Sequence, residues 1–277
     1  MNQEQPQPKR GLKVFLRYLK RMYWRPEMTL LPGQLAFFII LSLVPLITLI
    51  GYGASFFGLS IDTIIAILNN LSPGVAEMVE PMILGELGTG FIVFLVIMLY
   101  IASNGLASII VTSNTIFNIP QKPWIYRRIK GIILTIIIVA LYLFLLVLPV
   151  LGYQILSAID AFNIRPFLIN LITYLQVPIS WIIIFIFIKI IYTIAPDKKI
   201  PSKFMNWGAV FTTTGWVLTS TLYGFWVRNY ARHDIFYAGL ANLAVLMLWI
   251  YFLSMIFVIG MSINQRFLEQ NGNNRNK

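Results

Sequence analysis

Long runs of apolar residues follow one another along this chain. Six windows contain no Asp, Glu, Lys or Arg, and they cover residues 28–61, 87–121, 131–159, 166–188, 204–227 and 235–265. Each window is longer than the roughly 20 apolar residues that a helix needs to cross the core of a bilayer. The pattern predicts an all-α polytopic membrane protein with six transmembrane helices, at about 33–57, 89–113, 131–156, 167–188, 204–227 and 237–263.

A shorter amphipathic pattern precedes the first span. Apolar residues recur at helical spacing from Leu12 to Tyr23, and the opposite face carries Lys13, Arg17, Lys20 and Arg21. This predicts a cytoplasmic helix over 9–25 that lies in the interface and contacts lipid head groups. It acts either as a topology anchor or as a regulatory or lipid-binding element.

We expect the membrane domain at 26–268, with a short tail at each end of the chain. Residues 1–8 are polar and rich in proline, which predicts a disordered tail, and 269–277 form a cytoplasmic tail. The long loop at 60–88 has a helical apolar stripe, so further short interfacial helices are expected outside the membrane.

Composition and charge agree with this assignment. Only 11% of the residues are charged and the mean hydropathy is +0.78, whereas a soluble domain has about 25% charged residues. Of the 21 Lys and Arg residues, eighteen fall on the side of the termini. The positive-inside rule therefore places both termini in the cytoplasm, in a membrane that we expect to be a bacterial plasma membrane. The net charge of +11 follows the membrane, so no nucleic-acid partner is expected.

Polar residues mark one face of the second span. At 100° per residue, Asn104, Ser108, Thr115 and Asn118 fall within about 40° of one direction. Such a stripe indicates either close helix packing with hydrogen bonds between helices or the wall of a polar path. The fifth span carries a stripe of small or hydroxylated residues that we expect to face it, and the sixth offers a third wall. The crevice candidates on these two spans are Thr212, Thr219 and Asn242.

Two further features complete the description of the spans. Pro45 lies in the middle of the first span and predicts a helix kink. Arg127 and Arg128 precede the third span at the predicted inner head-group level, where they are expected to contact lipid head groups.

The sequence offers little catalytic chemistry. It contains no cysteine and one histidine, so we expect no metal site and no cofactor. The His233-Asp234 pair could form a general base, but a solvated loop histidine is the simpler interpretation. Metal-assisted RNA cleavage requires clustered carboxylates, and the acids on the cytoplasmic side are scattered. These are Glu4, Glu27, Asp197 and Glu269. The chain is therefore expected not to be an enzyme, and specifically not a ribonuclease.

Three blocks of the sequence resemble the YihY/BrkB family of bacterial inner-membrane proteins, which older labels call ribonuclease BN-like. They are "QLAFFIILSLVPLI" at 34–47, the Asn-rich end of the second span through Asn118, and 192–265. The third block has the Gly-Ala entry to the fifth span, Leu-Trp-x-Tyr and a terminal Gly-x-x-x-Asn. Where the family usually has Arg after the second block, this chain has Lys122-Pro123-Trp124. The resemblance implies a six-helix membrane fold and little about activity.

Uncharged polar stripes, interfacial helices and basic residues at the head-group level suit the passage of an amphiphile. The leading hypothesis is a transporter or scramblase of lipids or lipid-linked envelope precursors, with anionic membrane lipids as partners. The alternatives are a non-transporting scaffold or assembly factor and a passive channel for small solutes. The substrate, the energy coupling and the oligomeric state stay open.

Overall fold

The computed structural model describes residues 26–56, 62, 65, 91–158, 165–230 and 236–273. These residues form α-helices and one 3-10 helix, η2, with no strand among them. The elements are α2 (Pro26–Phe56), α5 (Phe91–Ile116), α6 (Trp124–Ala158), α7 (Arg165–Ile194), η2 (Ser202–Met205), α8 (Asn206–Tyr230) and α9 (Phe236–Asn273). The predicted all-α membrane class is confirmed. The basic residues of 9–25, most of the 60–88 loop and His233 lie outside the described residues.

Each of the six predicted spans overlaps one α-helix, and the fifth begins in η2. Within the described residues, three stretches are long and apolar enough to cross a membrane, namely Thr29–Ala54, Ile92–Ile116 and Ala241–Asn271. A shorter apolar stretch, Pro178–Ile194, lies in α7. The number of helices that cross the bilayer and their orientation stay predictions.

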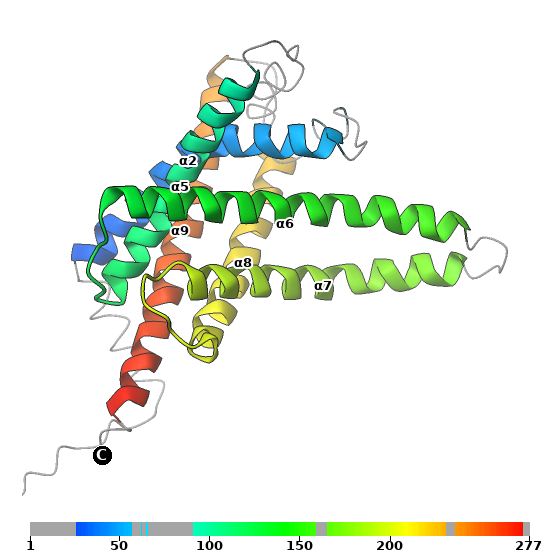
Figure 1. The fold of residues 1–277 in the computed structure, drawn as a ribbon. Coiled ribbons are helices and arrows are strands. Elements are labelled where there is room, and N and C mark those ends of the chain that lie inside the picture. The colour runs from blue at the N-terminus through cyan, green and yellow to red at the C-terminus, as the bar shows by residue number, and fades with distance from the viewer. Residues whose placement is uncertain are drawn as a thin grey trace, which may run out of the picture.

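α9 lies against α2 and α8, and α5 packs beside α2 (Figure 1). α5 also packs against α6. α6 and α7 extend from this assembly toward one side. The largest apolar cluster lies where the inner predicted ends of the helices converge. It includes Leu35 of α2, Ile188 of α7, Met205 of η2 and Val258 of α9, all nearly fully buried.

The α8–α9 contact explains the small-residue stripe of the fifth predicted span. A side chain at Gly208 would collide with the carbonyl of Gly260, and one at Gly260 would collide with Thr212. The backbone N–H of Gly208 donates to Asn264 Oδ1 at 2.7 Å, so Asn264 satisfies a donor in the first turn of α8. The expectation that this stripe faces the second span was wrong, because it packs on α9.

The first helix also depends on a close crossing. Ser42 Oγ accepts a hydrogen bond from the backbone N–H of Gly105 at 2.8 Å, which brings α2 and α5 together. Pro45 lies inside α2 three residues later, and Figure 1 shows that α2 changes direction along its length. A proline inside a helix removes one backbone hydrogen bond and permits such a bend.

Candidate functional site

The polar stripe of α5 serves different purposes along its length. At the inner end, Asn118 has a φ of 53°. The N–H of Asn118 donates to Thr115 O and the N–H of Ile119 donates to Asn114 O, which is the Schellman pattern of a helix C-terminus. Thr115 Oγ1 donates to Val111 O at 2.9 Å. Asn118 and Thr115 therefore take part in ending the helix, and their place in a polar crevice stays a prediction.

Further along α5, the stripe borders a pocket between three helices. The pocket has a volume of about 410 Å³, within the usual range of roughly 300–1,000 Å³ for small-molecule sites. Its lining comes from α2 (Gln34, Phe38), α5 (Tyr100, Asn104, Ala107, Ser108, Val111) and α6 (Trp124, Arg127, Arg128). We call this the basic pocket. Asn104 and Ser108 thus line a cavity with α2 and α6, and not with α8.

Arg128 is held across the basic pocket by α5. Its Nη1 atom donates to Asn104 Oδ1 at 2.8 Å and to Ser103 Oγ at 3.0 Å. The guanidinium lies 3.4 Å from the centre of the Tyr100 ring, a geometry in which the ring face attracts the cation. The amide and hydroxyl of α5 therefore orient a positive charge inside a largely helical, apolar assembly.

The positive charge of the basic pocket is not neutralised within the described part of the chain. Arg127 and Arg128 form no ion pair with a described residue. The ion pair among the described residues joins Lys130 and Asp197. The Nε atoms of both arginines and Ser108 Oγ are buried and make no hydrogen bond with a described residue. Buried donors are normally paired, so three polar atoms of residues that line the pocket lack a partner among the described residues.

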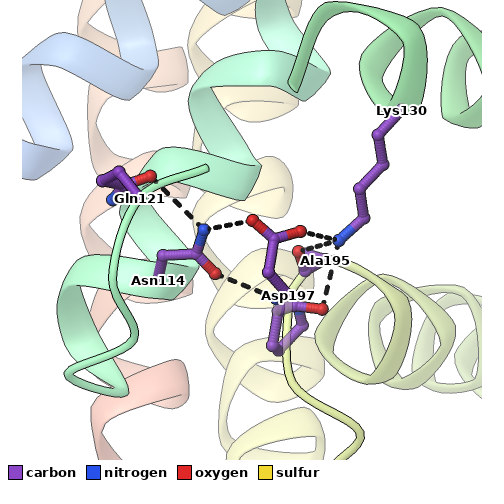
Figure 2. Close-up of polar contacts among 6 residues, drawn as sticks. Asn114, Gln121, Lys130, Ala195 and Asp197 are labelled. Atoms are coloured by element: carbon purple, nitrogen blue, oxygen red, sulfur yellow. Dashed lines mark hydrogen bonds and ion pairs between the residues drawn. The ribbon is translucent and has the colours of Figure 1, made fainter. Parts of the chain in front are cut away.

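A second polar group lies next to the basic pocket, and Figure 2 shows its contacts. Lys130 Nζ donates to Asp197 Oδ1 at 2.7 Å, and also to the carbonyls of Ala195 and Pro196. Asn114 Nδ2 donates to Asp197 Oδ2 at 2.7 Å, and Asp197 N–H donates to Asn114 Oδ1 at 2.9 Å. We call Asn114, Lys130 and Asp197 the polar clamp. It joins α5, α6 and the segment after α7.

The clamp keeps Asp197 ionised. Burial of the carboxyl favours the neutral form, but hydrogen bonds from Lys130 and Asn114 and the charges of Lys130 and Lys122 outweigh it, so the pKa of Asp197 lies below its usual value. The Asp197 side chain is 0% exposed, and that of Lys130 is 16% exposed. Because Lys130 follows Arg128 by two residues on α6, the clamp also fixes the position of the basic pocket's arginines.

Sequence reasoning found part of this arrangement. The structure brings Asn104, Ser108, Arg127 and Arg128 together in the basic pocket. It does not bring Thr219 or Asn242 to the pocket, and Thr212 is buried instead, bonded to Tyr192 Oη at 2.7 Å. Sequence reasoning missed the clamp. The signal was a single acid, Asp197, in a segment otherwise rich in lysine.

Carboxylates do not gather into a metal site in the described ranges. No group of three or more His, Cys, Asp or Glu side chains occurs there. Asp197 is occupied by the clamp, and Glu269 Oε1 accepts from Gln265. The chemistry of the basic pocket is therefore that of cations, amides and hydroxyls.

Apolar helices and a cationic pocket between them define a helical membrane protein. Comparison with known proteins is more specific, because residues 19–277 match the family described as Virulence factor BrkB, and the chain belongs to this family. The ribonuclease-like protein YfkH of Bacillus subtilis is 29% identical over 257 residues, covering 90% of this chain and 94% of that protein.

Shorter stretches resemble other membrane proteins. A UPF0761 membrane protein of Chromobacterium violaceum is 27% identical over 73 residues, which is 26% of this chain and 18% of that protein. One from Haemophilus influenzae is 25% identical over 92 residues, a third of each chain. No solved structure matches the chain.

Proposed function

We propose that this protein moves lipids or lipid-linked envelope precursors across a bacterial plasma membrane, as a transporter or a scramblase. The observation that carries the proposal is the basic pocket, in which Arg128 is held by Asn104 and Ser103 and has no carboxylate partner among the described residues. At the predicted inner head-group level, such a charge attracts anionic lipid head groups.

The surroundings of the basic pocket suit an amphiphile. Trp124 lines the pocket and is 61% exposed, and its α6 neighbours Ile125 and Ile129 are 64% and 54% exposed. A head group in the pocket would therefore have apolar side chains close by, where an acyl chain can remain in lipid. On the predicted topology the pocket faces the inner leaflet, where lipid would enter.

The test is lipid transfer in proteoliposomes. Fluorescent lipids of several anionic and zwitterionic head groups are placed in one leaflet, and the rate of their appearance in the other leaflet is compared with that in protein-free vesicles. The wild type is expected to exceed this baseline, and Asn104→Leu is expected to be slower while remaining folded. Wild-type rates equal to the baseline for every head group would favour a scaffold or assembly factor instead.

The relative's ribonuclease-like name does not fit the acids of this chain. Asp197 is engaged by Lys130 and Asn114, so it is not free to bind a metal or accept a proton. We therefore propose that the purified protein does not cleave RNA. Cleavage of a tRNA precursor that co-purifies with the folded protein and is lost in Asp197→Ala or Glu27→Ala would overturn this.

A further inference from the structure

We infer that the basic pocket binds the phosphate of a phosphomonoester lipid, with Arg127, Arg128 and Ser108 as its ligands. The inference rests on the proposed function, whose substrate class it names. It predicts a head group with a terminal phosphate in preference to a phosphodiester or a zwitterionic head group.

The first argument is the state of three donors. The Nε atoms of Arg127 and Arg128 and Ser108 Oγ are buried without a hydrogen-bond partner among the described residues. Ser103 and Thr115 on the same helix donate to the backbone carbonyls of Tyr100 and Val111. The Ser108 hydroxyl differs from them because it has no such bond. A terminal phosphate presents three strong acceptor oxygens, which suit the guanidinium groups and the hydroxyl of residues that line the pocket.

The second argument is charge. Arg127 and Arg128 place two positive charges at the pocket and form no ion pair with a described residue. Both belong to the first five residues of α6, whose helix dipole adds partial positive charge at that end. A phosphomonoester carries about −1.5 to −2 at pH 7, which neutralises the pair. A phosphodiester or a carboxylate carries only one negative charge.

The third argument concerns the source of the phosphate. Trp124 and the adjoining Ile125 and Ile129 are exposed apolar residues on α6 beside the arginines. A free phosphate metabolite gains nothing from such a surface, whereas an acyl chain is stabilised by it. A lipid is therefore the preferred source.

The test is binding to the purified full chain in a non-ionic detergent. Short-chain phosphatidic acid is titrated by isothermal calorimetry, and the melting temperature is followed in parallel, because a ligand of the folded state raises it. The wild type is expected to bind saturably. Arg127→Gln is expected to bind at least about tenfold more weakly, since hydrogen bonds to charged groups are the stronger ones. Arg127 makes no hydrogen bond through its side chain that this change would break.

Two variants separate the site from effects on folding. Ser108→Ala removes a buried hydroxyl that has no partner, so it is expected to leave the ligand-free melting temperature unchanged or higher while weakening binding severalfold. Lys199→Gln removes the same charge as Arg127→Gln from an exposed position outside the pocket, and it is expected to bind like the wild type. If Lys199→Gln weakens phosphatidic acid binding as much as Arg127→Gln does, the effect comes from net charge alone, and the inference of a site in the basic pocket is wrong.

The remaining arms identify the ligand. Inorganic phosphate binding as tightly as phosphatidic acid would overturn the lipid assignment, and equal binding of short-chain phosphatidylglycerol or phosphatidylcholine would overturn the phosphomonoester assignment. Failure of this inference differs from failure of the proposed function. Lipid transfer without head-group selectivity would support the proposed transport and contradict the phosphate site. Selective binding without lipid transfer would support the phosphate site and contradict the proposed transport.

Discussion

Two cations that lie two residues apart on α6, Arg128 and Lys130, have very different surroundings. Lys130 contacts a carboxylate and two backbone carbonyls and its side chain is 16% exposed, whereas Arg128 contacts an aromatic ring, an amide oxygen and a hydroxyl. The first set of contacts satisfies the charge completely and belongs to the structure. The second set orients the guanidinium at the lining of the basic pocket and gives it no carboxylate partner among the described residues.

The polar clamp makes a prediction for stability. Asp197→Ala should lower the free energy of unfolding by about 3–5 kcal/mol, because it leaves Lys130 and Asn114 with a lost partner in a buried position. Lys198→Ala, at the exposed next position in the same segment, should change it by less than about 0.5 kcal/mol. Denaturation of both variants in detergent measures these changes. If Asp197→Ala lowers the free energy of unfolding no more than Lys198→Ala does, the clamp does not stabilise the fold.

The clamp also has a defined pH dependence. The pKa of Asp197 is lowered in the folded state, so its contribution is fully present above the unfolded pKa, near 3.9, and is lost as the pH falls through the folded value. The stability difference between wild type and Asp197→Asn should therefore stay constant from pH 8 to about 5 and shrink below about pH 4. A difference that shrinks already between pH 7 and 5 would contradict this assignment.

At the scale of helices, the Gly-Ala motif at the entry to α8 contacts the Gly-x-x-x-Asn motif of α9. Gly208, at the entry to α8, lies against Gly260 and Asn264 of α9. The two backbones approach so closely that neither glycine has room for a methyl group. Trp249, from the Leu-Trp-x-Tyr motif, stacks on Tyr223 with ring centres 4.7 Å apart and continues the same interface along α8.

Alanine at these glycines tests the interface. Gly260→Ala should lower the free energy of unfolding by about 1–3 kcal/mol or more, because its methyl group would overlap Thr212 and Tyr192. Gly33→Ala is the matched control, since nothing lies within 4 Å of the added carbon. It should stabilise α2 by about 0.5–1 kcal/mol through helix propensity. Equal destabilisation by both substitutions would show that backbone flexibility, and not packing, governs the Gly260 position.

At the scale of the whole molecule, the distribution of charge predicts how the chain lies in the membrane. With six spans as predicted, eighteen of the 21 basic residues would fall on the side of both termini, and Arg127, Arg128, Lys130 and the segment around Lys198 would belong to that side. The basic pocket and the polar clamp would therefore both lie near the cytoplasmic head groups.

This topology can be measured directly because the chain has no cysteine of its own. Single cysteines at Asn70 and Asn273 are expected to react with a membrane-impermeant maleimide from opposite sides, the first in intact cells and the second only after the membrane is opened. Labelling of both positions in intact cells would contradict the cytoplasmic C-terminus. It would place the basic pocket in the outer leaflet.

The sequence by itself determined the class of the protein and the positions of its helices. Charge-free windows longer than a bilayer crossing admit only helices, so α2, α5, α6, α7, α8 and α9 could each be placed. Helical periodicity also identified one polar face on α5, because that face depends on residues close in sequence.

Only the tertiary structure decided what that face meets. Asn104 bonds Arg128, Asn114 bonds Asp197 and the small residues of α8 lie against α9. A stripe identifies the face of its own helix and carries no information about the neighbour, since many helices present small or polar residues. The neighbour depends on contacts between distant positions, such as Ser42 with Gly105 and Lys130 with Asp197, and these arise only when all the helices pack together.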